Sequence, residues 1–132
     1  MYELRQVKTQ NVVYNGETIC YLISVNDVCK EIVVSDAKFQ GSRSGTYLLH
    51  GGWCVTQEGT ARPLYKLKDK TEYFFYNQMY KYWMVGPVPC KNWGGIHGKS
   101  DASSPDQETE RWKEHDGSRW HETDIKIYCQ QG

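Results

Sequence analysis

Short apolar segments recur along the chain at a spacing of roughly ten residues, and turn-forming residues separate them. This spacing is typical of antiparallel all-β domains such as sandwiches and barrels. The segments predicted to be strands are 12–14, 18–23, 31–35, 46–49, 63–67, 72–86 and 123–129. We therefore expect an all-β chain with a compact, single-domain antiparallel sandwich or barrel-like fold and long loops.

An Asn-Gly dipeptide gives the strongest local turn signal. Asn15-Gly16 separates 12–14 from 18–23, and a type I′ turn needs positive φ at both central residues, which this pair supplies. The sequence thus predicts an N-terminal hairpin. We place this hairpin in an extension, residues 1–28, that precedes a module core over 29–129.

Further turn signals set the remaining boundaries. Asp116-Gly117 predicts a second two-residue turn, which would place Glu114 opposite Arg119 and His115 opposite Ser118. Gly51-Gly52 is expected to end the strand over 46–49. Pro63 is expected to begin the next strand, where a missing N–H is tolerated.

The most aromatic segment of the chain, 72–86, predicts a central hairpin. With a turn at Asn77-Gln78, Phe75 would lie opposite Tyr80 and Tyr73 opposite Tyr82, and both faces of the pair would be apolar. Such a pair is either buried on both sides or keeps one face as an exposed aromatic platform. We favour burial.

The segment after this hairpin, 86–105, is rich in Gly, Pro and Ser and is predicted to be a long loop. Loops of this length in compact domains usually carry function or move. Within the chain, only 104–110 has helix-forming character, because Ser104 can cap and Pro105 can occupy the first helical position. One or two helical turns are expected there.

Composition supports the all-β prediction and excludes some partners. Ten Tyr, five Trp and three Phe make 14% of the chain, whereas Ala, a good helix former, occurs at 37, 61 and 102. Sixteen basic residues balance sixteen acidic ones, so no bulk field favours a nucleic-acid partner. No run approaches the ~20 apolar residues that span a bilayer, so membrane insertion is not expected.

Five cysteines occur in this short chain, at positions 20, 29, 54, 90 and 129. None shows C-x-x-C spacing, so we interpret them as disulfide partners in an oxidising compartment rather than as zinc ligands. Buried thiols in a cytosolic protein are the alternative. The odd number leaves one unpaired. Residues 1–4 form no secretory signal, so a secreted form would be a mature chain with an added Met.

Several short motifs taken in order resemble a known family. They are Cys29-x-x-Ile32-x-Val34, Gly45-x-Tyr47, Arg62-Pro63-Leu64-Tyr65-Lys66, Tyr73-Phe74-Phe75-Tyr76, Trp83-x-Val85-Gly86, Ser104-Pro105, Trp112, Asp116-Gly117-x-x-Trp120 and Ile125-x-Ile127-x-Cys129. The pattern is similar to an extracellular β-rich, lectin-like module of secreted and multidomain invertebrate proteins. In those proteins it stands beside lectin-like, EGF-like and sushi-like modules.

The resemblance covers about residues 29–129 and carries structural and functional expectations. It implies a bridge between Cys29 and Cys129 that ties the first module strand to the last. Cys54 and Cys90, which look like additions to the family pattern, would form a second bridge, and Cys20 would be unpaired. The resemblance also implies an extracellular, secreted protein that binds glycans or matrix.

Catalytic and metal chemistry have little support. The four His residues lie in no nucleophilic motif, and the acids between 101 and 116 define no particular pair, so we expect no enzyme and no cofactor. His115 and His121 could meet across a turn but would point to opposite faces of the sheet, so no zinc site is expected. Residues 100–106 match a calcium loop only loosely.

Carbohydrate recognition is the function we favour, because sugar rings lie on aromatic rings while amide, carboxylate and imidazole groups bind the hydroxyls. The candidate ligand-binding residues are Trp93, Asn92, His97, Asp101, Trp53, Tyr80 and Tyr82. Trp93 and Trp53 stand beside glycines, and each could instead plug one end of the core. Trp83 is expected in the core, and Trp112 and Trp120 are expected to pack against the sheet.

The predicted partner is a glycan or glycoprotein. The alternative function is an extracellular protein-interaction or matrix/adhesion module without sugar binding, in which aromatic side chains would lie at an interface. In either case a homo-oligomer bridged through Cys20 would be a further partner.

Overall fold

The computed structural model describes residues 7–14, 17–24, 28–55, 61–107 and 109–130 of the 132-residue chain, with side chains at 28–51, 54, 62–107 and 109–130. No helix in this described part has the length and hydrophobicity needed to cross a bilayer. The elements are β1 (Val7–Tyr14), β2 (Glu17–Ser24), β3 (Glu31–Ser35), the 3₁₀ helix η1 (Gly41–Arg43), β4 (Gly45–Val55), β5 (Ala61–Leu67), β6 (Tyr73–Asn77), β7 (Tyr82–Gly86), β8 (Ile96–Lys99), β9 (Lys113–His115), β10 (Trp120–Glu122) and β11 (Lys126–Cys129).

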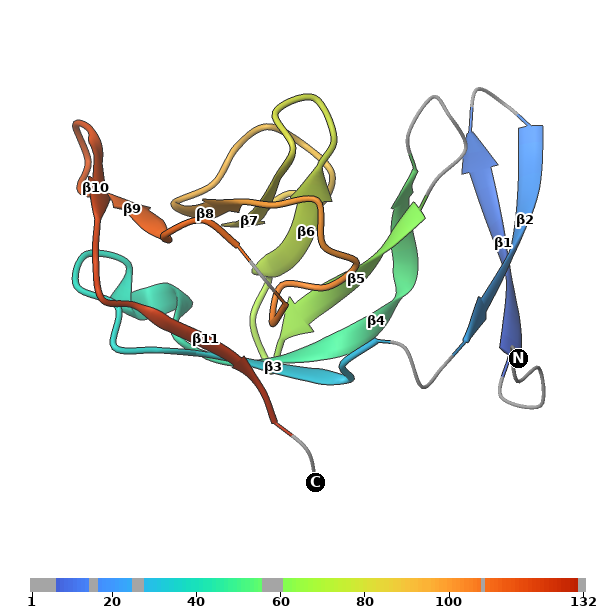
Figure 1. Ribbon diagram of the computed structural model, residues 1–132, viewed down its shortest axis with the longest axis horizontal. Coiled ribbons are helices and arrows are strands. Elements are labelled where there is room, and N and C mark those ends of the chain that lie inside the picture. The colour runs from blue at the N-terminus through green and yellow to red at the C-terminus, as the bar shows by residue number, and fades with distance from the viewer. Residues whose placement is uncertain (1–6, 15–16, 25–27, 56–60, 108, 131–132) are drawn as a thin grey trace.

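Nine strands form one antiparallel sheet that curls into a half-barrel (Figure 1), in the order β10-β9-β8-β7-β6-β5-β4-β3-β11. The two edge strands, β10 and β11, follow one another in the chain and are joined by residues 123–125 alone. So short a link spans at most about 14 Å, which keeps the two edges close at that end. The all-β, barrel-like prediction is confirmed.

The N-terminal hairpin is a separate two-stranded sheet. β1 pairs with β2 in an antiparallel register that places Tyr14 opposite Glu17, on either side of Asn15-Gly16. The predicted N-terminal hairpin is therefore confirmed. The backbone of Cys20 pairs with Asn11, whereas the side chain of Cys20 lies outside the described residues.

The inner face of the curled sheet carries the main core, which is built around aromatic rings. Phe74 is fully buried, and its ring meets the rings of Tyr47, Trp83 and Trp112 edge-on at centroid distances of 5.7, 6.1 and 5.7 Å. Edge-on contacts between rings add stabilisation beyond the area they bury. Trp83 and Trp112 thus pack in the interior, as predicted.

Buried tyrosines fix the loops that cover the core. The hydroxyl groups of Tyr47, Tyr65 and Tyr76 donate hydrogen bonds to backbone carbonyls of Arg43 (2.7 Å), Cys29 (2.5 Å) and Ser100 (2.7 Å). Burial raises the pKa of all three phenols, because the charged form would lose its hydration. Each ring therefore contributes apolar area to the core and a polar contact at its tip.

The central hairpin is formed by β6 and β7 and is buried on both faces, as favoured from the sequence. Its register differs from the prediction: Tyr73 pairs with Gly86 and Asn77 with Tyr82, so the turn spans 78–81 instead of Asn77-Gln78. In this register Tyr80 does not face Phe75 and belongs to the turn. The longer turn moves Met79 out of the sheet, where it is 79% exposed.

Other local predictions also need correction. The connection between β9 and β10 has four residues, 116–119, so His115 pairs with Trp120 rather than with Ser118. β4 continues through Gly51-Gly52 with a register shift between His50 and Trp53, because a bulge absorbs what the sequence suggested was a break.

Three further boundaries differ from the predicted ones. Pro63 is the third residue of β5 rather than its first. The predicted loop 86–105 contains β8, and the predicted helix at 104–110 is a turn in which the Gln107 amide donates to the Ser104 carbonyl at 3.3 Å. β8 lies in a Gly-rich segment and carries few apolar residues, so the hydrophobic pattern did not predict it as a strand.

A buried carboxylate joins the two sides of the curl. Glu114, on β9, is fully buried and accepts hydrogen bonds from the backbone amides of Lys38 (3.0 Å), Phe39 (2.9 Å) and Gln40 (2.9 Å) and from the Thr123 hydroxyl. Burial alone would raise its pKa, but the four hydrogen bonds outweigh that effect and lower the pKa. The segment after β3 is thereby held against β9.

The described side chains form two disulfides: the Cys29–Cys129 pair implied by the family resemblance and the Cys54–Cys90 pair expected for the two additional cysteines. Cys29 is bonded to Cys129, with Cα atoms 5.8 Å apart, and Cys54 is bonded to Cys90, with Cα atoms 5.4 Å apart. The first bridge joins Cys29, just before β3, to Cys129 at the end of β11, so it links residues that are 100 positions apart in the sequence. Bridges that close long loops restrict the unfolded chain most.

Replacing Glu114 by Gln should lower the free energy of unfolding by about 3 kcal/mol, because the amide removes the charge and turns an NH₂ group toward backbone donors. Urea unfolding at neutral pH measures this loss. The exposed Glu110→Gln variant is the matched control and should change stability by less than about 0.5 kcal/mol. A Glu114→Gln protein as stable as the control would contradict the structural role of this carboxylate.

Because the native pKa of Glu114 is lowered, its contribution to the free energy of unfolding should be present above the ordinary glutamate pKa and lost as the pH falls through the native pKa. Urea unfolding at a series of pH values measures this loss.

Removal of the Cys29–Cys129 bridge by paired Ser substitutions should lower the free energy of unfolding by about 3–5 kcal/mol, and removal of Cys54–Cys90 by slightly less, since its loop is shorter. Thermal unfolding of the two double variants under non-reducing conditions checks the order.

Candidate functional site

The outer face of the sheet carries a row of rings in contact, stacked from Tyr80 through Tyr82 to His97 and tilted or edge-on at Trp120. The ring centroids of Tyr80 and Tyr82 are 5.7 Å apart, those of Tyr82 and His97 4.3 Å, and those of His97 and Trp120 4.1 Å, and Trp120 in turn meets His115 at 5.1 Å. We call these five residues the outer stack. Most of their ring faces are used within the row, so mainly its two ends are open to a ligand.

Strand register explains why these side chains share one face. His97 on β8 pairs with Met84 on β7, so it lies diagonally beside Tyr82, and Trp120 on β10 pairs directly with His115 on β9. Cross-strand and diagonal neighbours on one face are within reach of aromatic side chains. The antiparallel order β7-β8-β9-β10 thus assembles the row.

His97 lies in the middle of the outer stack and is neutral at physiological pH. Burial, with a smaller effect from the charge of Lys113, lowers its pKa to about 4. The Nδ1 atom of His97 is buried and has no hydrogen-bond partner among the described residues. The imidazole therefore acts in the stack as a flat, uncharged ring.

The segment 87–94 folds back over the outer face of the central hairpin. At its two ends Gly86 and Gly94 approach other backbone atoms so closely that a Cβ would lie 2.1 Å from the Trp93 carbonyl oxygen and 2.3 Å from the Val85 carbonyl oxygen, respectively. Only glycine permits this approach. The Cys54–Cys90 bridge fixes the middle of the segment to β4.

Asn92 anchors the far end of this segment at the turn of the hairpin. Its Oδ1 accepts hydrogen bonds from Asn77 Nδ2 (2.8 Å) and the Tyr82 hydroxyl (3.3 Å). The next residue, Trp93, is 62% exposed, so it does not plug the core. Because the hydrogen bonds of Asn92 fix the chain at this point, the exposed Trp93 ring projects from an anchored backbone.

A cleft of about 200 Å³ lies where β5 begins and β6 ends. It is lined by Cys54, Arg62, Tyr76, Asn77, Gln78, Met79, Cys90 and Asn92. The Oε1 atom of Gln78 is shielded from solvent and finds no hydrogen-bond partner in the described part of the chain. The cleft therefore combines three carboxamides and one guanidinium beside the Cys54–Cys90 bridge.

The guanidinium of Arg62 is held rigidly at the wall of this cleft. Nε donates to the carbonyl of Ala102 and Nη2 to the carbonyl of Asp101, both at 3.0 Å, and Cζ lies 3.9 Å from the centroid of the Tyr76 ring. Backbone hydrogen bonds together with a cation–π contact fix the plane of an Arg side chain. Its position is thus set before any ligand binds.

The structure brings several of the predicted site residues together and separates others. Asn92, Tyr82, Tyr80 and His97 are linked by direct contacts, and Trp93 adjoins Asn92. The backbone of Trp53 pairs with Pro63, whereas its side chain lies outside the described residues.

Asp101 lies apart from that group. Its side chain lines a second cleft of about 280 Å³, together with Lys81, Lys99, Ser100, Thr109 and Glu110. Its own contribution to the first cleft is the backbone carbonyl that receives Arg62.

Arg62, Asn77 and Gln78 were not predicted from the sequence. They come from different strands and a turn, and none stands in a motif that signals binding. The corrected register at 78–81 is what places Gln78 in the cleft wall. Trp120 was expected to pack against the sheet; it packs on His97 and keeps 36% of its surface exposed.

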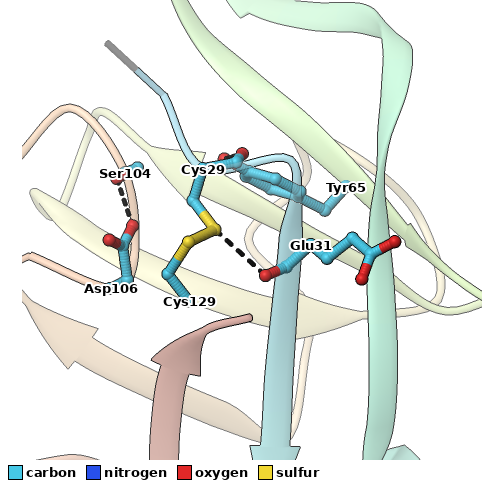
Figure 2. Close-up of a disulfide and its surroundings, with 6 residues drawn as sticks. All are labelled: Cys29, Glu31, Tyr65, Ser104, Asp106 and Cys129. Atoms are coloured by element: carbon cyan, nitrogen blue, oxygen red, sulfur yellow. Dashed lines mark hydrogen bonds between the residues drawn. A yellow bond between two sulfur atoms is a disulfide. The ribbon is translucent and has the colours of Figure 1, made fainter. Parts of the chain in front are cut away.

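One group of side chains has the spacing of a metal site, and its chemistry excludes that role in the oxidised protein. The sulfurs of Cys29 and Cys129 and a carboxylate oxygen of Asp106 lie within 4.8 Å of one another (Figure 2). The two sulfurs are bonded to each other, so neither is a thiolate, the form that binds zinc. Cys29 Sγ also lies 3.0 Å from the Glu31 carbonyl oxygen; because a disulfide sulfur has no proton, this is a sulfur–oxygen contact.

The two histidines at the β9–β10 hairpin do not converge. His115 pairs with Trp120 and His121 with Glu114, so the two imidazoles lie on opposite faces, as expected from their six-residue separation. His121 Nε2 instead lies 2.5 Å from Asp116 Oδ2. Amides of Arg119 and Ser118, together with His121, lower the pKa of Asp116. This turn is stabilised internally.

Comparison of the chain with protein-family models, with curated proteins and with solved structures found no match. The resemblance to the invertebrate module therefore stays a prediction. The function has to be argued from the geometry of the cleft and of the rings beside it.

His97 should titrate with a pKa of about 4 in an NMR experiment that follows its ring protons. Because the native pKa lies below the unfolded value of 6.5, protonation favours unfolding, and stability should fall as the pH drops from about 6.5 to 4. A His97→Phe variant keeps the stacked ring and should lose less stability over that range. Equal pH dependence in both proteins would contradict this assignment.

Proposed function

We propose that the protein is a secreted carbohydrate-binding, lectin-like module whose site is the cleft at Asn77, Gln78 and Asn92 with the exposed rings beside it. The observation that carries this proposal is the convergence of three carboxamides and Arg62 in one cleft, with the exposed Trp93 directly after Asn92 in the chain. A few fixed polar groups beside aromatic surface are the usual composition of a small-molecule site.

The polar groups of the cleft suit sugar hydroxyls. A carboxamide both donates and accepts hydrogen bonds, as a hydroxyl does, and the buried Oε1 of Gln78 lacks a partner in the described chain. Three carboxamides and a guanidinium that line one cleft support a hydroxyl-bearing ligand over an apolar one.

The rings at the rim suit the apolar faces of sugars. Trp93 is 62% exposed, and no ring contact or hydrogen bond joins its side chain to another described residue. Tyr80, the outermost member of the outer stack at this end, is 47% exposed and belongs to the same turn as Met79. Flat aromatic surface left open beside a polar cleft can receive the C–H face of a sugar ring.

The size of the cleft sets the size of the ligand portion that enters it. A volume of about 200 Å³ lies below the roughly 300–1,000 Å³ typical of sites for drug-sized molecules. The cleft therefore fits one monosaccharide residue, with the rest of a glycan outside it. The proposed partner is a glycan or a glycoprotein that presents such a residue.

Secretion is part of this proposal. Disulfides persist in oxidising compartments, and this chain forms two. The motif pattern that resembles an extracellular module of invertebrate proteins also supports an extracellular site of action. A homo-oligomer bridged through Cys20 would add avidity without a new contact.

A second candidate is an extracellular protein-interaction or matrix/adhesion module without sugar binding. It is favoured by the exposure of Met79, Tyr80 and Trp93, three large apolar side chains near one end of the sheet. Aromatic residues and Met are enriched at interface centres. A protein partner would bury all three, whereas a sugar would need only the rings and the amides.

The proposal predicts that a Trp93→Ala variant keeps its melting temperature and loses glycan binding by about tenfold or more. A glycan array followed by titration calorimetry on the best hit measures the binding, and intrinsic Trp fluorescence should respond to the same sugar. Tyr128→Ala, which removes an exposed ring from the edge strand β11, separated from β5 by β3 and β4 in the sheet, is the matched control and should bind normally. Absence of binding to any sugar at millimolar concentration would refute the lectin function.

A further inference from the structure

We infer that the sugar recognised by this cleft is acidic, with its carboxylate or sulfate group bound by the guanidinium of Arg62. This inference rests on the proposed function and specifies the class of ligand. It follows from two observations: Arg62 has no acidic partner among the described residues, and carboxamide side chains line the same cleft.

The charge of Arg62 has no acidic partner in the described chain. Its two hydrogen bonds go to the neutral carbonyls of Ala102 and Asp101, and no described carboxylate lies within ion-pair distance. Asp101 lines the second cleft with Lys81 and Lys99, and in addition to burial its carboxylate raises the pKa of Tyr76, without forming an ion pair with Arg62. A half-buried guanidinium bound only by dipoles and a ring keeps most of its attraction for an anion.

Donors remain on this guanidinium for such an anion. Arg carries five N–H groups, and the two hydrogen bonds to carbonyls use two of them. The side chain lines the cleft, and its plane is fixed against the Tyr76 ring. Because the orientation exists before binding, the anion meets donors whose conformational entropy has already been lost.

The uncharged polar side chains of the cleft favour a sugar over a simple anion. The carboxamides of Gln78 and Asn92 line the same cleft and can exchange hydrogen bonds with sugar hydroxyls. Among the described residues that line it, Arg62 is the charged one, so an anionic group is directed to Arg62. A ligand that satisfies both Arg62 and Gln78 carries an anionic group and a hydroxyl on one small frame, as an acidic monosaccharide does.

Calorimetric titration of the intact protein with four probes tests the inference. The probes are methyl glucuronide, a sulfated methyl glucoside, neutral methyl glucoside and acetate. The acidic sugars should bind at least about tenfold more tightly than the neutral glucoside, and the advantage should shrink as salt is raised. The carboxylate and sulfate arms show which anion the site prefers. Acetate should bind more weakly than methyl glucuronide, since it leaves Gln78 unpaired.

Variants assign the effect to Arg62. Arg62→Gln should reduce the affinity for the acidic sugars to about that of the same variant for the neutral glucoside, so that the preference for acidic sugars disappears. Arg62→Lys keeps the charge but loses the planar donor pair, so it should give an intermediate affinity. The matched control is Arg111→Gln, because Arg111 is exposed and pairs with Glu122 and Asp124 away from the cleft. It should bind like the unmodified protein.

A direct measurement covers the case in which Arg62→Gln disturbs the fold through the loop at Ala102. The Nε–Hε NMR signal of Arg62 in the unmodified protein should shift on addition of methyl glucuronide and remain in place with the neutral glucoside. An unmoved Arg62 signal at saturation would overturn the inference.

The remaining outcomes separate this inference from the proposed function. Equal affinities for methyl glucuronide and methyl glucoside would refute the acidic ligand and leave sugar binding standing. Acetate binding as tightly as methyl glucuronide would refute selection of a sugar acid in favour of a general anion site. Binding of none of the sugars would refute the proposed function and the inference with it.

Discussion

The hydrogen bonds of the buried Glu114 carboxylate are the interaction on which the curled shape of the main sheet depends. A nine-stranded antiparallel sheet that stays open at β10 and β11 would leave its aromatic inner face partly in water. The three backbone amides after β3 and the hydroxyl of Thr123 converge on Glu114, and this holds the segment 38–40 across the end of the curl. A charged acceptor is suited to this task because charge-assisted hydrogen bonds offset its loss of hydration.

Burial of the central hairpin β6–β7 holds the residues of the candidate site in place. Because β6 and β7 are buried on both faces, the hairpin is rigid, and its turn at 78–81 projects Gln78, Met79 and Tyr80 from a fixed base. The Cys54–Cys90 bridge and the close approach of Gly86 and Gly94 press the segment 87–94 onto the same hairpin. Loops held by a rigid scaffold are where binding residues are usually found.

The aromatic excess of the chain divides into three populations with different physical roles. Inner rings such as Phe74 and Trp83 fill the core, and buried tyrosines add hydroxyl contacts that fix loops. The rings of the outer stack contact one another, and the low pKa of His97 keeps its imidazole uncharged at neutral pH. Trp93 belongs to neither group, since its ring is open, and this sets it apart as a binding surface.

Hydrophobic period and local turn chemistry determined the all-β class, the N-terminal hairpin at Asn15-Gly16 and the burial of the strands over 73–77 and 82–86. Side-chain chemistry pointed to Asn92, Trp93, Tyr82 and His97 as candidate binding residues. The four-residue turns, the strand at Ile96–Lys99 and the cleft at Arg62 and Gln78 were decided by tertiary structure alone. Register there is set by packing against β5 and by the disulfide to Cys54, and neither constraint is written in the local sequence.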